Sequence, residues 1–484
     1  MKRFIFTISI ILLIGSCGKK PSNAISVSDY PVIFPDYINV TIPYNIAPLN
    51  FKLSGSFKKM YVEVKGKNIL LTSKNKRYAD FDLSQWKKLL HENAGGKIEI
   101  TVYAKNDKSW IKFRPFSIFI KKDCIDPYLS YRLIAPGYQV WSSMGIYQRS
   151  LENFKEKEII TNRLFPGTCM NCHSFKERDH ERMLLHVRGG KGGTFISNDS
   201  KLIKINSKPD DFYSGFQYPC WHPEGRYIAF SINQTAQVFH TAKDKRIEVF
   251  DSKSDIVIYD TNENKAIIDN KLISPDWFET FPTFSPDGKY LYFCSSRTKE
   301  MPAEFDKVKY NLCRIEFDAQ EGRFGSEVDT LVRVVDTNGS VSFPRISPDG
   351  KFLLFTLSDY GNFSIWHQEA DLYLLDLMTG KYWFLHEVNS DNTESYHSWS
   401  SNSRWIVFSS RRVDGLYTMP FFAWIDENGR AEKPFLLPQK DPEFYSNTFY
   451  SFNIPEFVDG RVFFSVKELE KAYNMEGKKV DVLP

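Results

Sequence analysis

The strongest constraint on the fold is a segment that recurs four times between residues 218 and 411. Each copy begins with an aromatic residue, passes through a tight turn made of Pro-Asp-Gly or a substitute, and continues into a hydrophobic strand that reaches a phenylalanine. The copies are YPCWHPEGRYIAFSIN (218–233), FPTFSPDGKYLYFCSS (281–296), FPRISPDGKFLLFTLS (343–358) and YHSWSSNSRWIVFSSR (396–411). Their phenylalanines are Phe230, Phe293, Phe355 and Phe408. Repetition at this period predicts an architecture in which each copy supplies one supersecondary unit.

Each copy continues into a second pair of strand-like segments, such as DIVIYDTNENKAII (255–268) and DLYLLDLMTGKYWFL (371–385). The Asp-Gly turn supplies the positive φ that a two-residue hairpin needs. Four antiparallel strands per copy make one blade of a β-propeller. An earlier blade is expected at about 168–207, with TCMNCHSF, RMLLHVRG, GTFISN and KLIKINS as its strands.

The last blade needs both ends of the repeat region. NIPEFVDGRVFFSVKE (453–468) offers only its first two strands, and GIYQRSLENFKEKEII (145–160) matches the missing outer pair. We therefore predict a six-bladed β-propeller over residues 127–468, whose last blade combines both chain ends and so leaves no open sheet edge. The tail, 469–484, is charged and is expected to be helical or loose.

The region before the repeats, 30–126, has a different pattern. Its segments YINVTIPY, LNFKLSG, MYVEVKG, KIEITVYA and WIKFRPFSIFI alternate between apolar and polar residues, which is typical of half-buried strands. A short helix is expected at LSQWKKLLH (83–91). The pattern favours a β-sandwich of immunoglobulin or fibronectin type, with its boundary at Asp126-Pro127. The chain as a whole is predicted to be all-β, in agreement with its 15% aromatic content.

The first residues form a targeting segment. Lys2 and Arg3 precede an apolar run, Phe4 to Ile14, that is too short to span a bilayer as an anchor, and Gly15-Ser16-Cys17 follows. This segment resembles a bacterial lipoprotein signal peptide (1–17). The resemblance implies that Cys17 is lipidated and becomes the mature N-terminus, followed by a flexible tether (18–29). Because Gly18, Lys19 and Lys20 come next, it also implies an outer-membrane position facing the periplasm, with the cell surface as the alternative.

The pentapeptide Cys169-Met170-Asn171-Cys172-His173 is the pattern C-x-x-C-H, which attaches c-type haem. The thiols of Cys169 and Cys172 bond to the haem vinyl groups, and His173 becomes the proximal iron ligand. With only 7 cysteines and 9 histidines in 484 residues, a chance match is improbable. Export would place the chain where haem is attached. The rival is zinc, for which two cysteines and a histidine need one more ligand, but no second such pair exists.

The distal side of this haem is less constrained. His186 is the preferred second ligand, because it interrupts the apolar run LLHVRG, and Met183 and His180 are the alternatives. The alternative for His186 is a hydrogen-bonded core histidine, and five-coordinate iron with an open site is a third arrangement. Arg182 and Arg188 are candidates to pair with the haem propionates.

Other histidines and cysteines are placed by the repeat. His397 stands at the start of an inner strand and is a candidate for the channel mouth, whereas His222 replaces the serine of a Ser-Pro-Asp-Gly turn. The cysteines outside the motifs are read mainly as buried apolar residues, with one disulfide as the alternative. They are Cys124, Cys220, Cys294 and Cys313.

The repeats resemble the WD40-like repeats called PD40, which build the TolB-type β-propeller. The Ser-Pro-Asp-Gly core is intact at 285–288 and 347–350 and degenerate at 222–225 and 400–403. With the lipoprotein signal and the single C-x-x-C-H motif, the whole chain resembles a family of exported lipoproteins of Bacteroidota type. The resemblance is specific for the fold and says little about activity.

Two functions follow as hypotheses. The first is a membrane-tethered periplasmic protein that carries one covalent haem c on a propeller scaffold, for electron transfer or redox sensing. The second is a non-catalytic propeller that binds protein or glycan partners, with the haem structural or absent. An enzyme is less expected, since G-x-S-x-G and H-E-x-x-H are missing. A net charge of +4, with the charges interspersed, gives no reason to expect nucleic acid as a partner.

Overall fold

The computed structural model describes residues 20–75, 78–135, 143–165, 167–198, 201–206, 208–239, 247–462 and 465–483, so the expected lipidation site Cys17 lies outside the described residues. The chain forms two compact units. The first comprises Met1–Ile125, Leu151–Phe154 and Lys433–Thr448, and the second comprises Asp126–Ser150, Lys155–Glu432 and Phe449–Pro484. The first division falls between Ile125 and Asp126, one residue before the expected boundary at Asp126-Pro127, and the first unit also takes two segments from within the range 127–468.

The first unit contains two sheets and a capped helix. The larger sheet comprises β1 (Ala24–Ser26), β3 (Thr41–Pro43), β5 (Lys59–Lys65), β6 (Leu70–Asn75), β8 (Lys97–Lys105), β9 (Trp110–Lys112) and β10 (Phe116–Lys121). The smaller comprises β2 (Ile33–Phe34), β4 (Phe51–Leu53) and β7 (Tyr78–Ala79). The pairs β1–β9 and β3–β10 are parallel. Short elements of this unit late in the chain are β33 (Phe435–Leu436) and α3 (Phe444–Asn447).

The helix α1 (Leu83–Glu92) confirms the one helix expected in this region. It begins after Asp82, whose carboxylate accepts a hydrogen bond from the Gln85 backbone N–H at 2.9 Å. Trp86, Leu89 and Leu90 form its buried face, as their helical spacing predicts.

The second unit contains six sheets within the described residues. In three of them, four consecutive strands pair in chain order, and all pairs are antiparallel. The first is β14 (Cys169–Phe175), β15 (Met183–Arg188), β16 (Gly193–Asn198) and β17 (Lys201–Ile205). The next are β22 (Trp277–Phe284), β23 (Tyr290–Arg297), β24 (Asn311–Asp318) and β25 (Arg323–Val332), then β26 (Ser340–Ile346), β27 (Phe352–Ser358), β28 (Asp371–Asp376) and β29 (Tyr382–Phe384).

Two further sheets follow the same order. One contains β18 (Phe216–Trp221), β19 (Tyr227–Phe239), β20 (Ile247–Asp260) and β21 (Lys265–Ile267), and the other contains β30 (Glu394–Trp399), β31 (Trp405–Ser410) and β32 (Met419–Trp424). The C-terminal β35 (Asp481–Leu483) adds to β21 in parallel. Short helical turns connect some strands: Lys176–Arg178, Phe305–Lys307, α2 (Val334–Thr337) and Ser364–Trp366.

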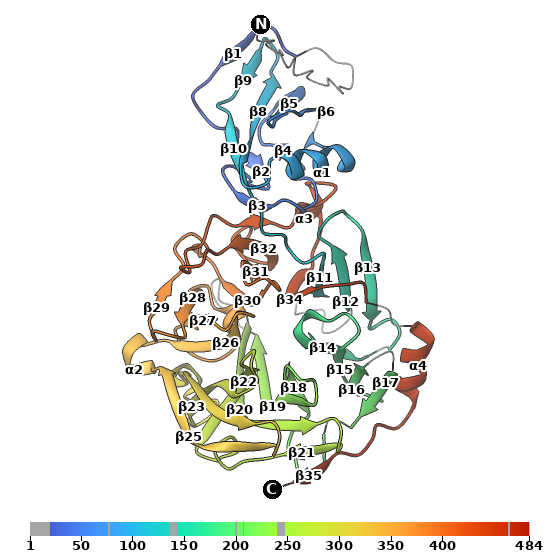
Figure 1. Cartoon of the computed structure of the whole chain (residues 1–484), viewed down its shortest axis with the longest axis vertical. Coiled ribbons are helices and arrows are strands. Elements are labelled where there is room, and N and C mark those ends of the chain that lie inside the picture. The colour runs from blue at the N-terminus through green and yellow to red at the C-terminus, as the bar shows by residue number, and fades with distance from the viewer. Residues whose placement is uncertain are drawn as a thin grey trace, which may run out of the picture. The chain divides into compact units, whose positions relative to one another are not determined.

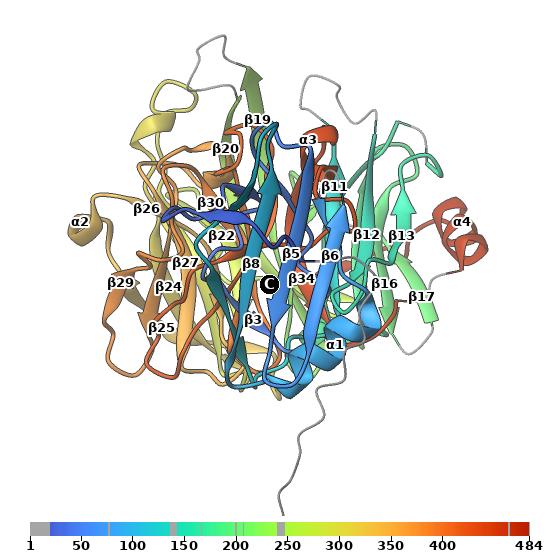
Figure 2. The same cartoon turned by 90° about the horizontal axis from the view of Figure 1, so that it is seen from above.

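The sixth sheet joins distant parts of the chain, in the order β13, β12, β11, β34. Its strands are β11 (Tyr128–Ile134), β12 (Met144–Ser150), β13 (Glu156–Thr161) and β34 (Ser451–Val458). The C-terminal part therefore supplies one strand and not the expected two, because β11 takes the second position. The residues after β34 form the helix α4 (Val466–Asn474), which lies beside β17 (Figures 1 and 2).

The first strands of the six sheets lie next to one another. β14 lies next to β18, β18 next to β22, and the series continues through β26, β30 and β34 back to β14. Figure 1 shows these strands towards the middle of the second unit, while outer strands such as β13, β25 and β29 lie at its periphery. Apolar side chains pack between neighbouring sheets, as where Leu184 meets Phe230 and Ile232. We call these six strands the inner strands.

The repeat residues do what their sequence predicts. Phe230, Phe293, Phe355 and Phe408 are all buried in second strands. The turn glycines Gly225, Gly288 and Gly350 have φ of 83°, 73° and 72°, and Ser403 takes the same place in the fourth copy with φ of 60°. Among the described residues, no helix is long and apolar enough to cross a membrane.

Candidate functional site

The C-x-x-C-H segment is the inner strand β14, and its register explains its place in the repeat. Each inner strand breaks register with its neighbour once, and in five of them the break contains a residue with positive φ. Those residues are Tyr218, Phe281, Phe343, Tyr396 and Ile454. In β14 the break falls between Asn171 and His173, so Cys172 occupies the sixth equivalent position. Aligning Cys-His-Ser-Phe (172–175) with Tyr-His-Ser-Trp (396–399) would have revealed this from sequence.

Four of the five positions carry aromatic rings, and these rings pack together. Ring centroids are 4.6 Å apart for Tyr218 and Phe281, 4.0 Å for Phe281 and Phe343, and 4.7 Å for Phe343 and Tyr396. A positive φ strains a bulky residue, so its recurrence at equivalent positions marks a built feature of the inner strands.

A cavity of about 190 Å³ opens beside these rings and is lined by residues of all six inner strands. We call it the central pocket. Its polar members include His173, Cys220, Arg345, His397 and Glu456, and Trp221 and Trp399 add aromatic surface. Sequence reasoning placed His173 and His397 near the channel but did not single out Cys220, Arg345 or Glu456, which no local motif marks.

His173 is 3% exposed, and neither of its ring nitrogens has a hydrogen-bond partner among the described residues. Burial, assisted by the positive charge of Arg132, lowers the pKa of His173 to about 3. The imidazole is therefore neutral at physiological pH, which is the form that coordinates metals. A buried polar group without a protein partner is unusual and makes His173 a candidate ligand.

His397 has a similar environment. It is 4% exposed, its Nε2 lies 3.0 Å from the carbonyl oxygen of Leu354, and its Nδ1 has no partner among the described residues. Burial, with Arg345 nearby, lowers its pKa to about 3, although the backbone carbonyls of Leu354 and Phe343 oppose this shift. Because a carbonyl can only accept, Nε2 carries the proton and Nδ1 keeps a free lone pair.

The burial of His397 should make folding pH-dependent. Between pH 6.5 and 3, His397 is protonated in the unfolded chain but not in the folded protein. The contribution of His397 to the free energy of unfolding is therefore lost as the pH falls. Lowering the pH from 7 to 5 should decrease the free energy of unfolding of the parent protein by about 2 kcal/mol more than it decreases that of the His397→Gln variant. Urea titrations at both pH values measure this difference. The solvent-exposed His386, replaced by Gln, is the matched control, and equal pH dependence of H397Q and the parent would contradict the prediction.

Glu456 gives the central pocket an unusually weak carboxylic acid. Burial raises its pKa to about 7, against the opposing effects of the Phe175 N–H, which donates to Oε1 at 3.0 Å, and of Arg345 and Arg178. Near neutral pH this carboxyl can therefore donate or accept a proton. Beside it, Arg345 supplies a permanent positive charge.

The other residues proposed around the haem lie elsewhere and do not line the central pocket. His186 is buried, and its Nδ1 lies 3.0 Å from Thr194 Oγ1 on the neighbouring strand β16. Met183 packs in an apolar core cluster. His180 contacts Asp459, with 2.9 Å between Nδ1 and Oδ1.

The two arginines and His222 have partners of their own. Arg182 lies 3.8 Å from Asp179, and Arg188 donates to Gln217. His222 packs against Phe284 and places its Nε2 3.1 Å from the Gly288 carbonyl oxygen, which supports the turn role expected for it. Among the described cysteines whose state is defined, none forms a disulfide, and Cys124 is exposed while Cys294 and Cys313 are buried.

Haem can be tested against the residues present. The unpartnered, neutral imidazole of His173 fits an axial ligand. Cys169, however, is 6% exposed and packs in an apolar cluster with Met144 and Phe165, away from the central pocket. The side chain of Cys172 lies outside the described residues. The cavity is also smaller than the 300–1,000 Å³ of typical cofactor sites. The imidazole of His173 therefore suits an axial ligand, whereas the volume of the cavity and the position of Cys169 do not fit a covalently attached haem in the conformation of β14 that the structure shows.

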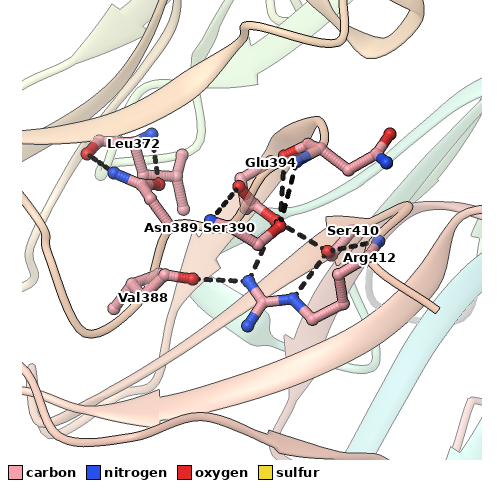
Figure 3. Close-up of polar contacts among 8 residues, drawn as sticks. Leu372, Val388, Asn389, Ser390, Glu394, Ser410 and Arg412 are labelled. Carbon is pink, nitrogen blue, oxygen red and sulfur yellow. Dashed lines mark hydrogen bonds and ion pairs between the residues drawn. The ribbon is translucent and has the colours of Figure 1, made fainter. Parts of the chain in front are cut away.

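The buried ion pair between Glu394 and Arg412 stabilises the fold and is not a candidate ligand-binding site. Glu394 is fully buried, lies 2.9 Å from Arg412 and accepts hydrogen bonds from Ser390 and Ser410 (Figure 3). Arg412 also donates to the Val388 carbonyl. Because these polar groups satisfy one another, they leave little for a ligand to bind.

Comparisons of this chain with known proteins find no match by sequence and low similarity by structure. No family model and no curated protein matches it. A structure of prolyl oligopeptidase B from Galerina marginata, bound to a 35mer hydrolysis and macrocyclization substrate, is similar over 70% of this chain and 42% of its own, with 11% identity and a TM-score of 0.37. The chain thus spans less than half of that protein. A DUF4784 family protein from Bacteroides caccae is similar over 74% of this chain and 95% of its own, with 8% identity and a TM-score of 0.31.

Proposed function

We propose that the second unit is a six-bladed β-propeller that carries one covalent haem c on its first inner strand and serves electron transfer or redox sensing. The observation that carries the proposal is His173. It completes a C-x-x-C-H motif, lines the central pocket, and has two buried ring nitrogens that find no hydrogen-bond partner in the described part of the chain.

The propeller is supported by three features of the second unit. Its inner strands follow one another in a cycle from β14 to β34 and back. All six share one register break at equivalent positions. One sheet also unites β11 to β13 with β34 from the other end of the chain, as closure of a propeller requires.

The protein's own residues define what the site can do. Haem, when bound, supplies a one-electron redox centre. His173 offers a neutral imidazole, and aromatic rings line the pocket beside it. Arg345 and Glu456 set the local charge, and the proton on Glu456 is exchangeable near pH 7. A redox centre beside such a carboxyl should have a reduction potential that varies with pH.

The experiment is expression in a host with c-type haem maturation, followed by a denaturing gel stained for haem peroxidase activity. We expect a stained band for the parent and for Cys124→Ser, and none for Cys169→Ser combined with Cys172→Ser. An unstained parent band would contradict the haem proposal. Metal analysis of that haem-free protein would then test zinc, the rival ligand of the same motif.

A second function is favoured by the central pocket itself. Besides the histidines, Trp221 Nε1 and Arg178 Nε at this pocket are buried and have no partner among the residues that the structure describes. A haem-free protein would therefore still present donors for a small ligand or a segment of a partner protein. Retention of a partner by the haem-free double cysteine variant would favour this interaction role.

The cellular setting is proposed from the N-terminal signal. We propose that Cys17 is lipidated and that the protein is anchored in the outer membrane, facing the periplasm. Incorporation of labelled palmitate into the parent and not into Cys17→Ser would support this. Equal labelling of both proteins would contradict it.

A further inference from the structure

Two charged groups of the central pocket stand at one position of the repeat. This position lies two residues after Tyr218 and after its equivalents on the other inner strands. In β26 and β34 it holds Arg345 and Glu456, and both residues line the pocket. In the other four inner strands it holds a small residue, namely Ser174, Cys220, Thr283 and Ser398. Since a small residue suffices for the fold in four sheets, the two charges serve the pocket rather than the fold.

A second guanidinium reaches the central pocket from the turn that follows β14. Arg178 lines the cavity, and its Nε is buried without a partner among the described residues. Glu177 and Arg178 have φ of 46° and 71°, a left-handed conformation that residues other than glycine rarely adopt. Strain of this kind persists only where the surrounding structure holds it, and it clusters at ligand-binding sites. Here the Asp459 N–H donates to the Arg178 carbonyl at 3.0 Å and so holds the turn.

The donors of the central pocket fit a carboxylate. Trp221 Nε1 can only donate, and it is buried with no acceptor in the described part of the chain. The Arg345 guanidinium has five N–H groups, of which Nη1 donates to the Pro344 carbonyl at 2.8 Å. Guanidinium groups match carboxylates in geometry and bind them through paired hydrogen bonds. An ionised carboxylate only accepts, so it supplies what these donors need.

The rest of the pocket wall is apolar. Phe284, Phe343 and Trp399 line the cavity. The N–H of Trp399 already donates to the Arg345 carbonyl at 3.1 Å, which leaves its ring as apolar surface. Apolar walls with a few polar groups that fix orientation are typical of sites for small organic molecules. The volume of about 190 Å³ restricts the ligand to a small one.

We propose that the central pocket binds a small organic acid, whose carboxylate is held by Arg345 and Arg178 and whose apolar body lies against the aromatic wall. This inference rests on the interaction role given above as the second function, and it requires no haem. The carboxylate can belong to a free aromatic acid or to the C-terminal residue of a peptide, because both present the same chemistry to the two arginines.

Glu456 should couple this binding to pH. Its carboxyl has a pKa of about 7, and the charges of Arg345 and Arg178 act on it. An ionised Glu456 would compete with the ligand for both arginines, so the ligand binds best when Glu456 is protonated. From pH 6 to pH 8 the protonated fraction falls about tenfold, and the affinity should fall by the same factor.

The other titratable groups near this carboxyl do not produce the same change. Burial lowers the pKa of His173 and of His397 to about 3, so both are neutral throughout this range. Burial raises the pKa of the Cys220 thiol, which therefore also stays neutral. Glu177 is exposed and lies 3.2 Å from Lys176. The two arginines keep their charge at every pH used.

The test is isothermal titration calorimetry of the whole chain with benzoate and phenylacetate at pH 6 and pH 8. Both acids stay ionised, because carboxylic acids titrate near pH 4. We expect saturable binding at pH 6, about tenfold weaker binding at pH 8, and no binding of the neutral analogues benzamide and benzyl alcohol. Glu456→Gln should bind equally at both pH values.

Arginine variants locate the carboxylate. Arg345→Gln and Arg178→Gln should each weaken binding at least tenfold, whereas Arg430→Gln, which replaces an exposed arginine of the same unit, should bind as the parent does. Arg345→Lys keeps the charge without the paired donors and should fall between. Urea titrations of the same proteins show which variants fold, and Arg178→Gln carries the test if Arg345→Gln does not.

A tetrapeptide ending in phenylalanine, with a free or an amidated C-terminus, distinguishes the two sources. Tighter binding of the free peptide than of phenylacetate assigns the carboxylate to a peptide C-terminus, and the reverse order assigns it to a free acid. Equal binding of acids and neutral analogues, or unchanged affinity in both glutamine variants of the arginines, overturns the inference. Sulfate that binds as tightly as the acids overturns it too, because the apolar body then contributes nothing. A parent that binds no acid but retains a protein partner overturns this inference alone and leaves the interaction role in place.

Discussion

Replacing Glu394 by alanine should lower the free energy of unfolding by about 3–5 kcal/mol. Its carboxylate is fully buried and accepts hydrogen bonds from the Ser390 backbone N–H at 3.0 Å and from the hydroxyls of Ser390 and Ser410 at 2.7 Å. The same carboxylate lies 2.9 Å from Arg412, whose side chain is 18% exposed. Removing it would leave a largely buried guanidinium without its counter-charge, and that residual charge accounts for most of the cost.

Urea unfolding followed by intrinsic fluorescence measures this loss. Glu427→Ala, which removes an exposed carboxylate of the same unit, is the matched control and should change stability by less than about 0.5 kcal/mol. A double variant, Glu394→Gln with Arg412→Met, should recover part of the loss because no unpaired charge remains. A loss below about 1 kcal/mol in Glu394→Ala would contradict the argument.

The sequence predicts elements whose determinants are local and misses those that depend on distant partners. The Pro-Asp-Gly turns and the alternating strands around Phe293 and Phe355 are local patterns, and the structure confirms them. β11 was missed because its position depends on β34, where Tyr128 pairs with Val458, more than 300 residues away. Residues up to 468 were expected to continue as a strand, but α4 begins at Val466; its later part lies in the tail that was expected to be helical or loose, with Leu469 and Ala472 buried at helical spacing.

The residues of the candidate site also divide into those that a local motif identifies and those that come together only in the fold. The C-x-x-C-H motif identifies Cys169, Cys172 and His173 from spacing alone. The polar partners of the histidines cannot be found by spacing, because Leu354 reaches His397 from another sheet and Thr194 reaches His186 across a strand pair. An isolated histidine in an apolar run therefore suggested a ligand at His186, where the fold provides a hydroxyl. Glu456 and Arg345 were missed because they meet only when the inner strands assemble.

The turn glycines offer a sharper test of packing between sheets. Gly288 and Gly350 stand at the same repeat position, with φ of 73° and 72°. Replacing either glycine by alanine therefore costs the same backbone strain, about 1–2 kcal/mol, because alanine disfavours this left-handed conformation. A Cβ on Gly350 would meet nothing within 4 Å. A Cβ on Gly288 would lie 2.3 Å from His222 Nε2. Gly288→Ala should therefore cost about 2–5 kcal/mol, because overpacking adds about 1–3 kcal/mol to the strain.

His222 has no easy way to move aside. It is 1% exposed, its ring packs 4.9 Å from Phe284, and its Nε2 lies 3.1 Å from the Gly288 carbonyl oxygen. Parallel urea titrations of Gly288→Ala and Gly350→Ala isolate the contact, since the backbone strain cancels in their difference. Combining Gly288→Ala with His222→Ser, which restores the residue of the intact repeats, should reduce that difference. Equal losses in the two single variants would show that the His222 ring yields without cost, and would remove the steric argument for its place in the turn.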